Sequence, residues 1–153
     1  MSEPAGRKPA DEAAVTESDP ARIRAEVGRV FDSYAAAFTR LDAPAVARHF
    51  CVPSIMSSND GYIVWNAREQ VLANMVALCD LYRAHGFVAA RYELLEVIPQ
   101  PPAHAFAHVR WIIRRHHGLP SLSFRTSYSL RRDVQDWRVL LCTAYEESRQ
   151  ETL

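Results

Sequence analysis

The feature that most constrains the fold of this 153-residue chain is a change of hydrophobic period at His85–Gly86. Before this point, most apolar residues recur every three or four positions, which is the spacing of one face of an α-helix. After it, the period becomes that of strands, and four extended segments are separated by breaks rich in Pro, Gly or Asp. These segments cover residues 87–98, 104–115, 122–132 and 137–147. Helices followed by consecutive strands predict an α+β fold with an antiparallel sheet.

The first half of the chain opens with two predicted helices. An apolar stripe from Val27 to Leu41 predicts a helix of about 20 residues. Ser18 or Asp19, followed by Pro20, is a suitable N-cap for it. A second, short helix is predicted within residues 42–50, because it opens with Asp and a first-turn Pro.

A hairpin and a third helix complete the first half. Extended runs at residues 53–58 and 62–65 flank the turn Asn59-Asp60-Gly61, which is a strong hairpin signal. Asn66 and Glu69 have the spacing of a capping box, which predicts the start of a helix that ends at the change of period.

Composition restricts the class of protein. Hydrophobic residues make up 48% and charged residues 24% of the chain, as in soluble globular proteins. The net charge is zero, so no overall field attracts nucleic acid or an anionic membrane, and neither is an expected partner. No apolar run is long enough for a membrane span. The first 20 residues lack the apolar segment of a signal peptide. The three cysteines form no CxxC motif, which indicates a reducing compartment. We therefore expect a cytoplasmic protein with a disordered tail at residues 1–20, a single domain at residues 21–148 and a C-terminal tail at residues 149–153.

Several segments together resemble the nuclear-transport-factor-2-like superfamily, which includes ketosteroid isomerases and SnoaL-like polyketide cyclases. They are the first-helix aromatics Phe31 and Tyr34, "LDAPAVARHF" at 41–50, "NAREQV" at 66–71 and "DWRVLLCTAYEE" at 136–147. The resemblance implies a cone, a cystatin-like α+β barrel in which a strongly curved antiparallel sheet wraps around the long helices. It also implies a pocket at the open end of the cone.

The same resemblance allows isomerase chemistry to be tested against the sequence. That chemistry needs a helix-one tyrosine, a carboxylate base on the first hairpin and a protonated acid on a late strand. Tyr34 fits the tyrosine, but the base position falls on Ser58 and the late acid position falls near Thr126. Asp60 lies in the turn, where it should face water. Because two of three groups are missing, catalysis of the ketosteroid isomerase type is not expected.

The residues expected to line the cone are instead aromatic or neutral and polar. Such a pocket suits a small, mostly uncharged molecule and contains no evident general base. The candidate ligand-pocket residues are Tyr34, Phe38, Ser58, Trp65, Trp111, Thr126 and Tyr128.

Strand register decides whether an acid or base enters this pocket. In residues 104–115 one alternate set is uniformly apolar and should face the core, so His108 and Arg110 should face outward. A register shifted by one residue would bring both into the pocket and favour a cyclase or lyase. If the protein is an enzyme, His108 and Glu146 are the candidate acid or base residues.

Histidines and arginines give weaker signals. His104 and His108 lie about 13 Å apart on an extended strand, too far to chelate one ion, so no metal or other cofactor is predicted. The arginines between residues 110 and 138 lack the exposed aromatic stripe of an RNA-binding sheet, and a solvated hairpin tip is the better interpretation.

The last strand is apolar on both faces, so one face needs a cover outside the core. A homodimer through the outer sheet face would provide it, and the resemblance implies the same mode of pairing. The residues predicted for this interface are Phe106, Ile112, Val139, Leu141 and Tyr145.

Three functions remain open from the sequence. The leading hypothesis is a SnoaL-like protein that binds an unidentified small apolar ligand. The second is a cyclase, isomerase or lyase that uses a pocket His or Glu. The third is a protein–protein interaction module that uses the sheet or the mouth of the cone.

Overall fold

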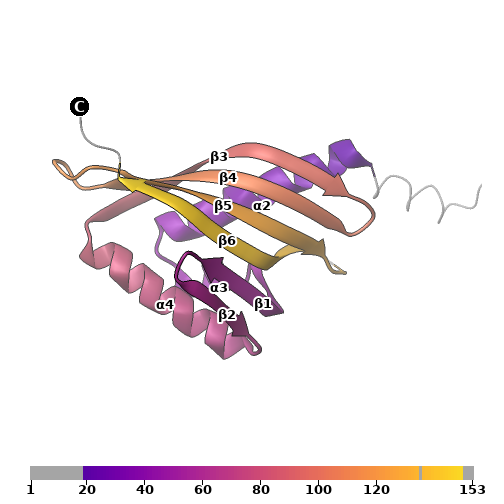
Figure 1. Ribbon diagram of the computed structural model, residues 1–153, viewed down its shortest axis with the longest axis horizontal. Coiled ribbons are helices and arrows are strands. Elements are labelled where there is room, and N and C mark those ends of the chain that lie inside the picture. The colour runs from indigo at the N-terminus through magenta and orange to yellow at the C-terminus, as the bar shows by residue number, and fades with distance from the viewer. Residues whose placement is uncertain (1–18, 135, 150–153) are drawn as a thin grey trace, which may run out of the picture.

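The computed structural model describes residues 19–134 and 136–149. Most of the two tails predicted at residues 1–20 and 149–153 therefore lies outside the described residues. Helices and strands follow one another in the predicted order (Figure 1). The elements are α2 (Pro20–Thr39), α3 (Ala43–Ala47), β1 (Phe50–Ser58), β2 (Gly61–Trp65), α4 (Arg68–Ala84), β3 (Phe87–Gln100), β4 (His104–Arg115), β5 (Leu122–Arg132) and β6 (Trp137–Arg149).

The strands form one six-stranded sheet in the order β2-β1-β6-β5-β4-β3. The last four strands form a meander, and the β1–β2 hairpin joins it along β6. β1 and β6 run parallel, whereas the other neighbouring pairs are antiparallel. In Figure 1, α2 lies along one face of the long strands, and α4 lies beside the short hairpin. The predicted α+β class with a curved sheet around long helices is confirmed.

Two helices begin as predicted, each with an aspartate N-cap and a first-turn proline. Asp19 accepts a hydrogen bond from the Ala21 N–H at 3.0 Å, and Asp42 accepts one from the Ala45 N–H at 3.1 Å. Both bonds satisfy N–H groups that a helix start would otherwise leave unpaired.

The third helix, α4, begins differently from the prediction. Its N-cap is Ala67, not Asn66, and the Ala67 side chain makes no capping bond. Gln70, not Glu69, reaches back, and its Oε1 accepts from the N–H groups of Asn66 at 2.6 Å and Ala67 at 3.2 Å. The predicted capping box was therefore wrong by one position.

The core lies between α2 and the inner face of the sheet, where aromatic rings pack edge to face. Phe31 and Tyr128 have ring centroids 5.0 Å apart, and Tyr34 contacts Trp111 at 5.6 Å. The inner set of β4 is also buried: Ala105, Ala107, Val109, Trp111 and Ile113. The predicted register of this strand is therefore confirmed, and His108 and Arg110 belong to the outer face.

β-Bulges change the register of other strand pairs, including β5–β6 at Ser129/Leu130. Because of this bulge, Val139 pairs with the buried Leu130, while Leu141 pairs with Ser129 on the outer face. Val139 is 1% exposed and belongs to the core cluster. Its predicted place on the outer face was therefore wrong, because a bulge exchanges the two faces of the strand beyond it.

Candidate ligand pocket

A pocket of about 170 Å³ lies between the C-terminal half of α2, the helix α4 and the inner face of the sheet. Five of the seven predicted pocket residues line it: Tyr34, Phe38, Trp111, Thr126 and Tyr128. Eight further described residues line it, and they are apolar apart from a tyrosine hydroxyl and a thiol. They are Met56, Leu78, Tyr82, Ala90, Ile113, Phe124, Cys142 and Ala144.

Ser58 and Trp65 do not line this pocket. Ser58 is exposed at the end of β1, where its hydroxyl accepts a hydrogen bond from the Asp60 N–H at 3.3 Å. Met56, two residues earlier on the same strand face, takes the pocket position instead. Trp65 is buried against Phe50, with ring centroids 5.7 Å apart, so it belongs to the core under the hairpin. Both predicted placements were wrong.

Among the described residues of the pocket wall, the Thr126 hydroxyl lacks a hydrogen bond of normal geometry. The Trp111 indole N–H donates to the Tyr128 hydroxyl at 2.9 Å, so the indole is paired. The Thr126 hydroxyl oxygen is buried and has no hydrogen-bond partner of normal geometry. A buried polar atom of this kind costs free energy unless another molecule supplies the bond.

Three ionisable groups of the pocket are held in their neutral forms. Burial raises the pKa of Tyr34 and of Tyr128 well above the usual value. Burial likewise raises the pKa of the Cys142 thiol to about 12. At neutral pH these groups carry their protons, so they can donate hydrogen bonds but cannot act as bases or thiolate nucleophiles. Among the described lining residues there is no carboxylate and no imidazole.

Of the two candidate acid or base residues, His108 is not among the described residues that line this pocket. His108 lies on the outer face of β4, where its imidazole contacts the Tyr145 hydroxyl and stacks on the Tyr145 ring. The alternative in which a shifted register brings His108 and Arg110 into the pocket is therefore wrong. Glu146 belongs to the backbone of β6, but its side chain lies outside the described part of the structure.

The described residues lack two other kinds of feature. No group of three or more His, Cys, Asp or Glu side chains among them is arranged to hold a metal ion. None of the helices in the same residues has the length and apolar character needed to cross a membrane.

The sequence from residue 25 to residue 147 matches the protein family described as NTF2-like protein (DUF6841). This match covers most of the chain. The protein belongs to this NTF2-like family. A comparison of the sequence with curated proteins finds no match.

Solved structures show the same fold in proteins of low sequence identity. An NTF2-like protein of unknown function from Shewanella oneidensis MR-1 superposes with a TM-score of 0.66 at 14% identity, covering 80% of this chain and 98% of that one. A ketosteroid isomerase-like protein from Erwinia carotovora atroseptica SCRI1043 gives a TM-score of 0.63 at 15% identity, with 84% and 96% covered. A protein of unknown function with a cystatin-like fold from Nostoc punctiforme PCC 73102 gives 0.64 at 12% identity, with 83% and 92% covered. At these identities, the solved structures are similar to this NTF2-like protein in fold alone.

Proposed function

We propose that this NTF2-like protein binds a small, mostly apolar, uncharged molecule in the pocket between α2, α4 and the sheet. The observation that carries the proposal is the Thr126 hydroxyl, which is buried in a mostly apolar wall and makes no hydrogen bond of normal geometry to the described residues. A ligand hydroxyl or carbonyl group that bonds to Thr126 would remove this cost and would fix the orientation of the ligand.

The volume of the pocket limits the size of the ligand. An engineered protein cavity of about 150 Å³ holds one benzene molecule, and this pocket measures about 170 Å³. The ligand is therefore about the size of a single ring with one or two substituents. The aromatic lining suits such a ring, because Tyr34, Phe38 and Trp111 present ring faces and edges to it.

The neutrality of the described lining residues disfavours most charged ligands. A carboxylate or ammonium group would lose its hydration in the pocket without gaining an opposite charge, which costs several kcal/mol in proteins. Tyr34 and Tyr128 remain protonated at neutral pH because burial raises the pKa of both. They offer the ligand hydrogen bonds but no compensating positive charge.

Phenol and benzene are a matched pair of probes for this proposal. Both fit the volume, but only phenol carries a hydroxyl for Thr126. We expect both to bind, with chemical shift changes at Trp111 and Thr126 in NMR titrations. We expect Thr126→Val to weaken phenol binding about fivefold to tenfold, the cost of one neutral hydrogen bond, and to leave benzene binding unchanged.

Ser127→Val is the control, because Ser127 is the next residue on β5 and belongs to the opposite set of this alternating strand. It should change the affinity for neither probe. Ala144→Phe fills the pocket from β6 and should abolish both interactions. Equal affinity of the wild-type protein and Ala144→Phe for benzene would refute the proposal. Native mass spectrometry of the purified protein is a separate measurement, which would identify a natural ligand retained during purification.

A further inference from the structure

A second and larger cavity also lies against α2, and it shares no described lining residue with the pocket around Tyr34 and Trp111, here called the aromatic pocket. It is a cleft of about 740 Å³ between the N-terminal half of α2, the residues that follow α3 and the β5–β6 turn. Arg22, Glu26, Arg29 and Ser33 all line it. These residues are spaced by four, three and four positions, so they form one stripe along the helix. The cleft is polar, whereas the first pocket is apolar.

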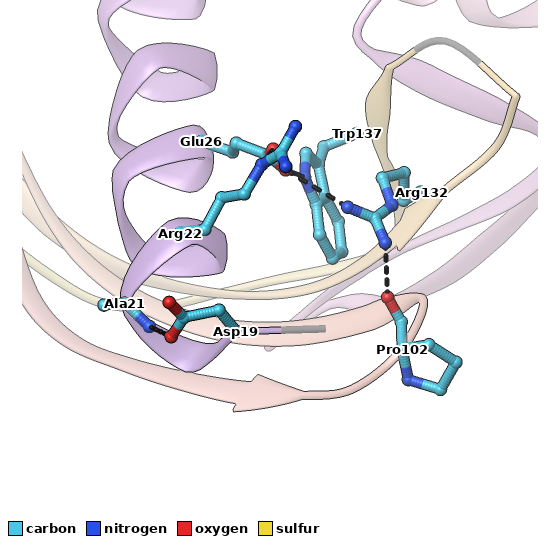
Figure 2. Close-up of polar contacts among 7 residues, drawn as sticks. All are labelled: Asp19, Ala21, Arg22, Glu26, Pro102, Arg132 and Trp137. Atoms are coloured by element: carbon cyan, nitrogen blue, oxygen red, sulfur yellow. Dashed lines mark hydrogen bonds and ion pairs between the residues drawn. The ribbon is translucent and has the colours of Figure 1, made fainter. Parts of the chain in front are cut away.

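One wall of the cleft is a fixed network centred on Glu26 (Figure 2). The Glu26 carboxylate accepts from the Trp137 indole N–H at 2.6 Å and pairs with Arg22 at 3.0 Å and with Arg132 at 3.4 Å. Arg132 also donates to the Pro102 carbonyl at 2.8 Å, and its guanidinium lies over the Trp137 ring. These groups are engaged with one another, so they shape the cleft and hold its wall in place.

Five arginines and three carboxylates line the cleft, and two of the arginines make no ion pair in residues 19–134 and 136–149. These two are Arg29 on α2 and Arg48 just after α3, and both are exposed. Asp133 is paired with Arg138 at 3.7 Å, which leaves Asp136 as the lining carboxylate that opposes them. The balance of unpaired charge in the cleft is therefore positive.

His49, which also lines the cleft, is hydrogen-bonded at both ring nitrogens and neutral. His49 Nδ1 lies 2.8 Å from the Ala45 carbonyl, which can only accept, so Nδ1 carries a proton. Its Nε2 lies 3.0 Å from the Ser33 hydroxyl. Burial lowers the pKa of His49, so the ring is uncharged at neutral pH. The positive charge of the cleft therefore resides on its arginines.

We propose that this cleft binds a small organic anion, through carboxylate or phosphate oxygens that pair with Arg29 and Arg48. Guanidinium groups bind both kinds of oxygen in a bidentate way, and two unpaired ones at one cavity leave an anion as the matching partner. The volume lies within the range of about 300–1,000 Å³ that is typical of small-molecule sites. The site is separate from the aromatic pocket and does not depend on the function proposed for it.

Citrate and inorganic phosphate are the probes that test this proposal and distinguish the two chemistries. At low ionic strength, where screening is weak, we expect at least one of them to bind saturably to the full-length protein. The amide signals of Arg29, Ser33 and Arg48 should shift in NMR titrations. Saturation by citrate alone would assign a carboxylate ligand, and saturation by phosphate alone would assign a phosphate ligand. Glycerol, which is uncharged, should produce no shift.

Single substitutions test the proposed contacts. Arg29→Gln and Arg48→Gln should each weaken binding of the better probe about tenfold, because each removes a charge-assisted hydrogen bond. Asp136→Asn should tighten binding, because it removes the opposing charge. Arg24→Gln is the matched control, since Arg24 is exposed on the same helix but does not line the cleft.

Absence of saturable binding by either probe would overturn the proposal. An equal loss in Arg24→Gln and Arg29→Gln would also overturn it, because it would show attraction to the whole surface. Thermal unfolding of each variant confirms that it is folded. Because Arg29 and Arg48 are exposed, the melting temperatures of their variants should match that of the wild-type protein.

Discussion

Glu26 has an environment unlike that of an ordinary surface carboxylate. Its side chain is only 16% exposed, and three donors from α2, β5 and β6 converge on it. Burial alone would raise the pKa of Glu26. The hydrogen bonds from Trp137 and Arg22 and the charge of Arg132 outweigh burial, so the pKa lies below its usual value. The folded state therefore favours the ionised form of this side chain.

We expect Glu26→Gln to lower the free energy of unfolding by about 1–3 kcal/mol at neutral pH, the range for hydrogen bonds to charged groups. A glutamine can still accept from Trp137, but it leaves Arg132 without its carboxylate. Because the folded pKa of Glu26 is depressed, its contribution is complete above the unfolded pKa and is lost as pH falls through the folded pKa. Urea unfolding at about pH 7 and about pH 3 should show the two proteins converging in acid.

Glu93→Gln is the control for this measurement. Glu93 pairs with Arg110 at 3.6 Å, but its side chain is 55% exposed. An exposed pair of this kind contributes less than about 1 kcal/mol. Equal effects of the two substitutions at neutral pH would contradict the role assigned to Glu26.

Single residues of the site were predicted from sequence only in part. Tyr34, Phe38, Trp111, Thr126 and Tyr128 could be placed because strict alternation or helical spacing fixes the face of each. Whether Ser58 and Trp65 reach the pocket depends on how far along β1 and β2 they lie. Alternation predicts which face of a strand a residue is on, but not its distance from the pocket. The arginine cleft, which is the cavity lined by Arg29 and Arg48, had no local signal in the sequence. Its residues come from separate segments, namely α2, the end of α3 and the β5–β6 turn.

At the scale of elements, the end of α4 depends on Gly86. This residue has φ +80°, a left-handed conformation that favours glycine. A Cβ atom there would lie 2.9 Å from Leu119 Cδ1 and 3.2 Å from His116 Cδ2. The backbone conformation therefore requires glycine here, and a Cβ atom would also displace the exposed Leu119 side chain of the β4–β5 connection.

Gly86→Ala should lower the free energy of unfolding by about 1–2 kcal/mol from backbone strain, with a further cost from the contact to Leu119. Gly28→Ala is the comparison, and it should change the free energy of unfolding in the opposite direction. Gly28 lies inside α2, and a Cβ atom added to it would have nothing within 4 Å, so alanine there should raise stability by about 0.5–1 kcal/mol. Chemical denaturation of both variants measures the difference, and stabilisation by Gly86→Ala would contradict this account.

The elements themselves were predicted well, because each has a periodic pattern with a break at either end. The strand predicted at residues 104–115 has the observed bounds of β4. The β5–β6 bulge was not predicted, since no residue type marks it, and it alone moved Val139 from the outer face into the core. Periodicity predicts a face only as long as the register is unbroken.

At the scale of the whole molecule, the outer face of the sheet carries apolar residues that the core does not use. Phe106, Ile112, Leu141 and Tyr145 are only partly exposed there, and the remaining prediction is that a second copy covers them. Sedimentation velocity at micromolar concentration should show a dimer. Leu141→Asp should give a monomer, because it places a charge in the centre of an apolar interface.

Val134→Asp is the control for the dimer experiment. Val134 is 99% exposed in the β5–β6 turn, so the same charge added there should leave the dimer intact. A monomeric wild-type protein would contradict the prediction. The sheet face would then be a surface of the isolated chain.

The ring of Tyr34, which lines the aromatic pocket, contacts the ring of His49, which lines the arginine cleft, with centroids 5.3 Å apart. The two cavities are thus separated at this point by a partition of two side chains. His49 is held from the helical side by Ser33 and the Ala45 carbonyl, whereas Tyr34 packs against Trp111 and Tyr128 of the sheet. The aromatic pocket and the arginine cleft therefore share a wall at this point, and a redesign that enlarges one of them at Tyr34 or His49 takes its space from the other.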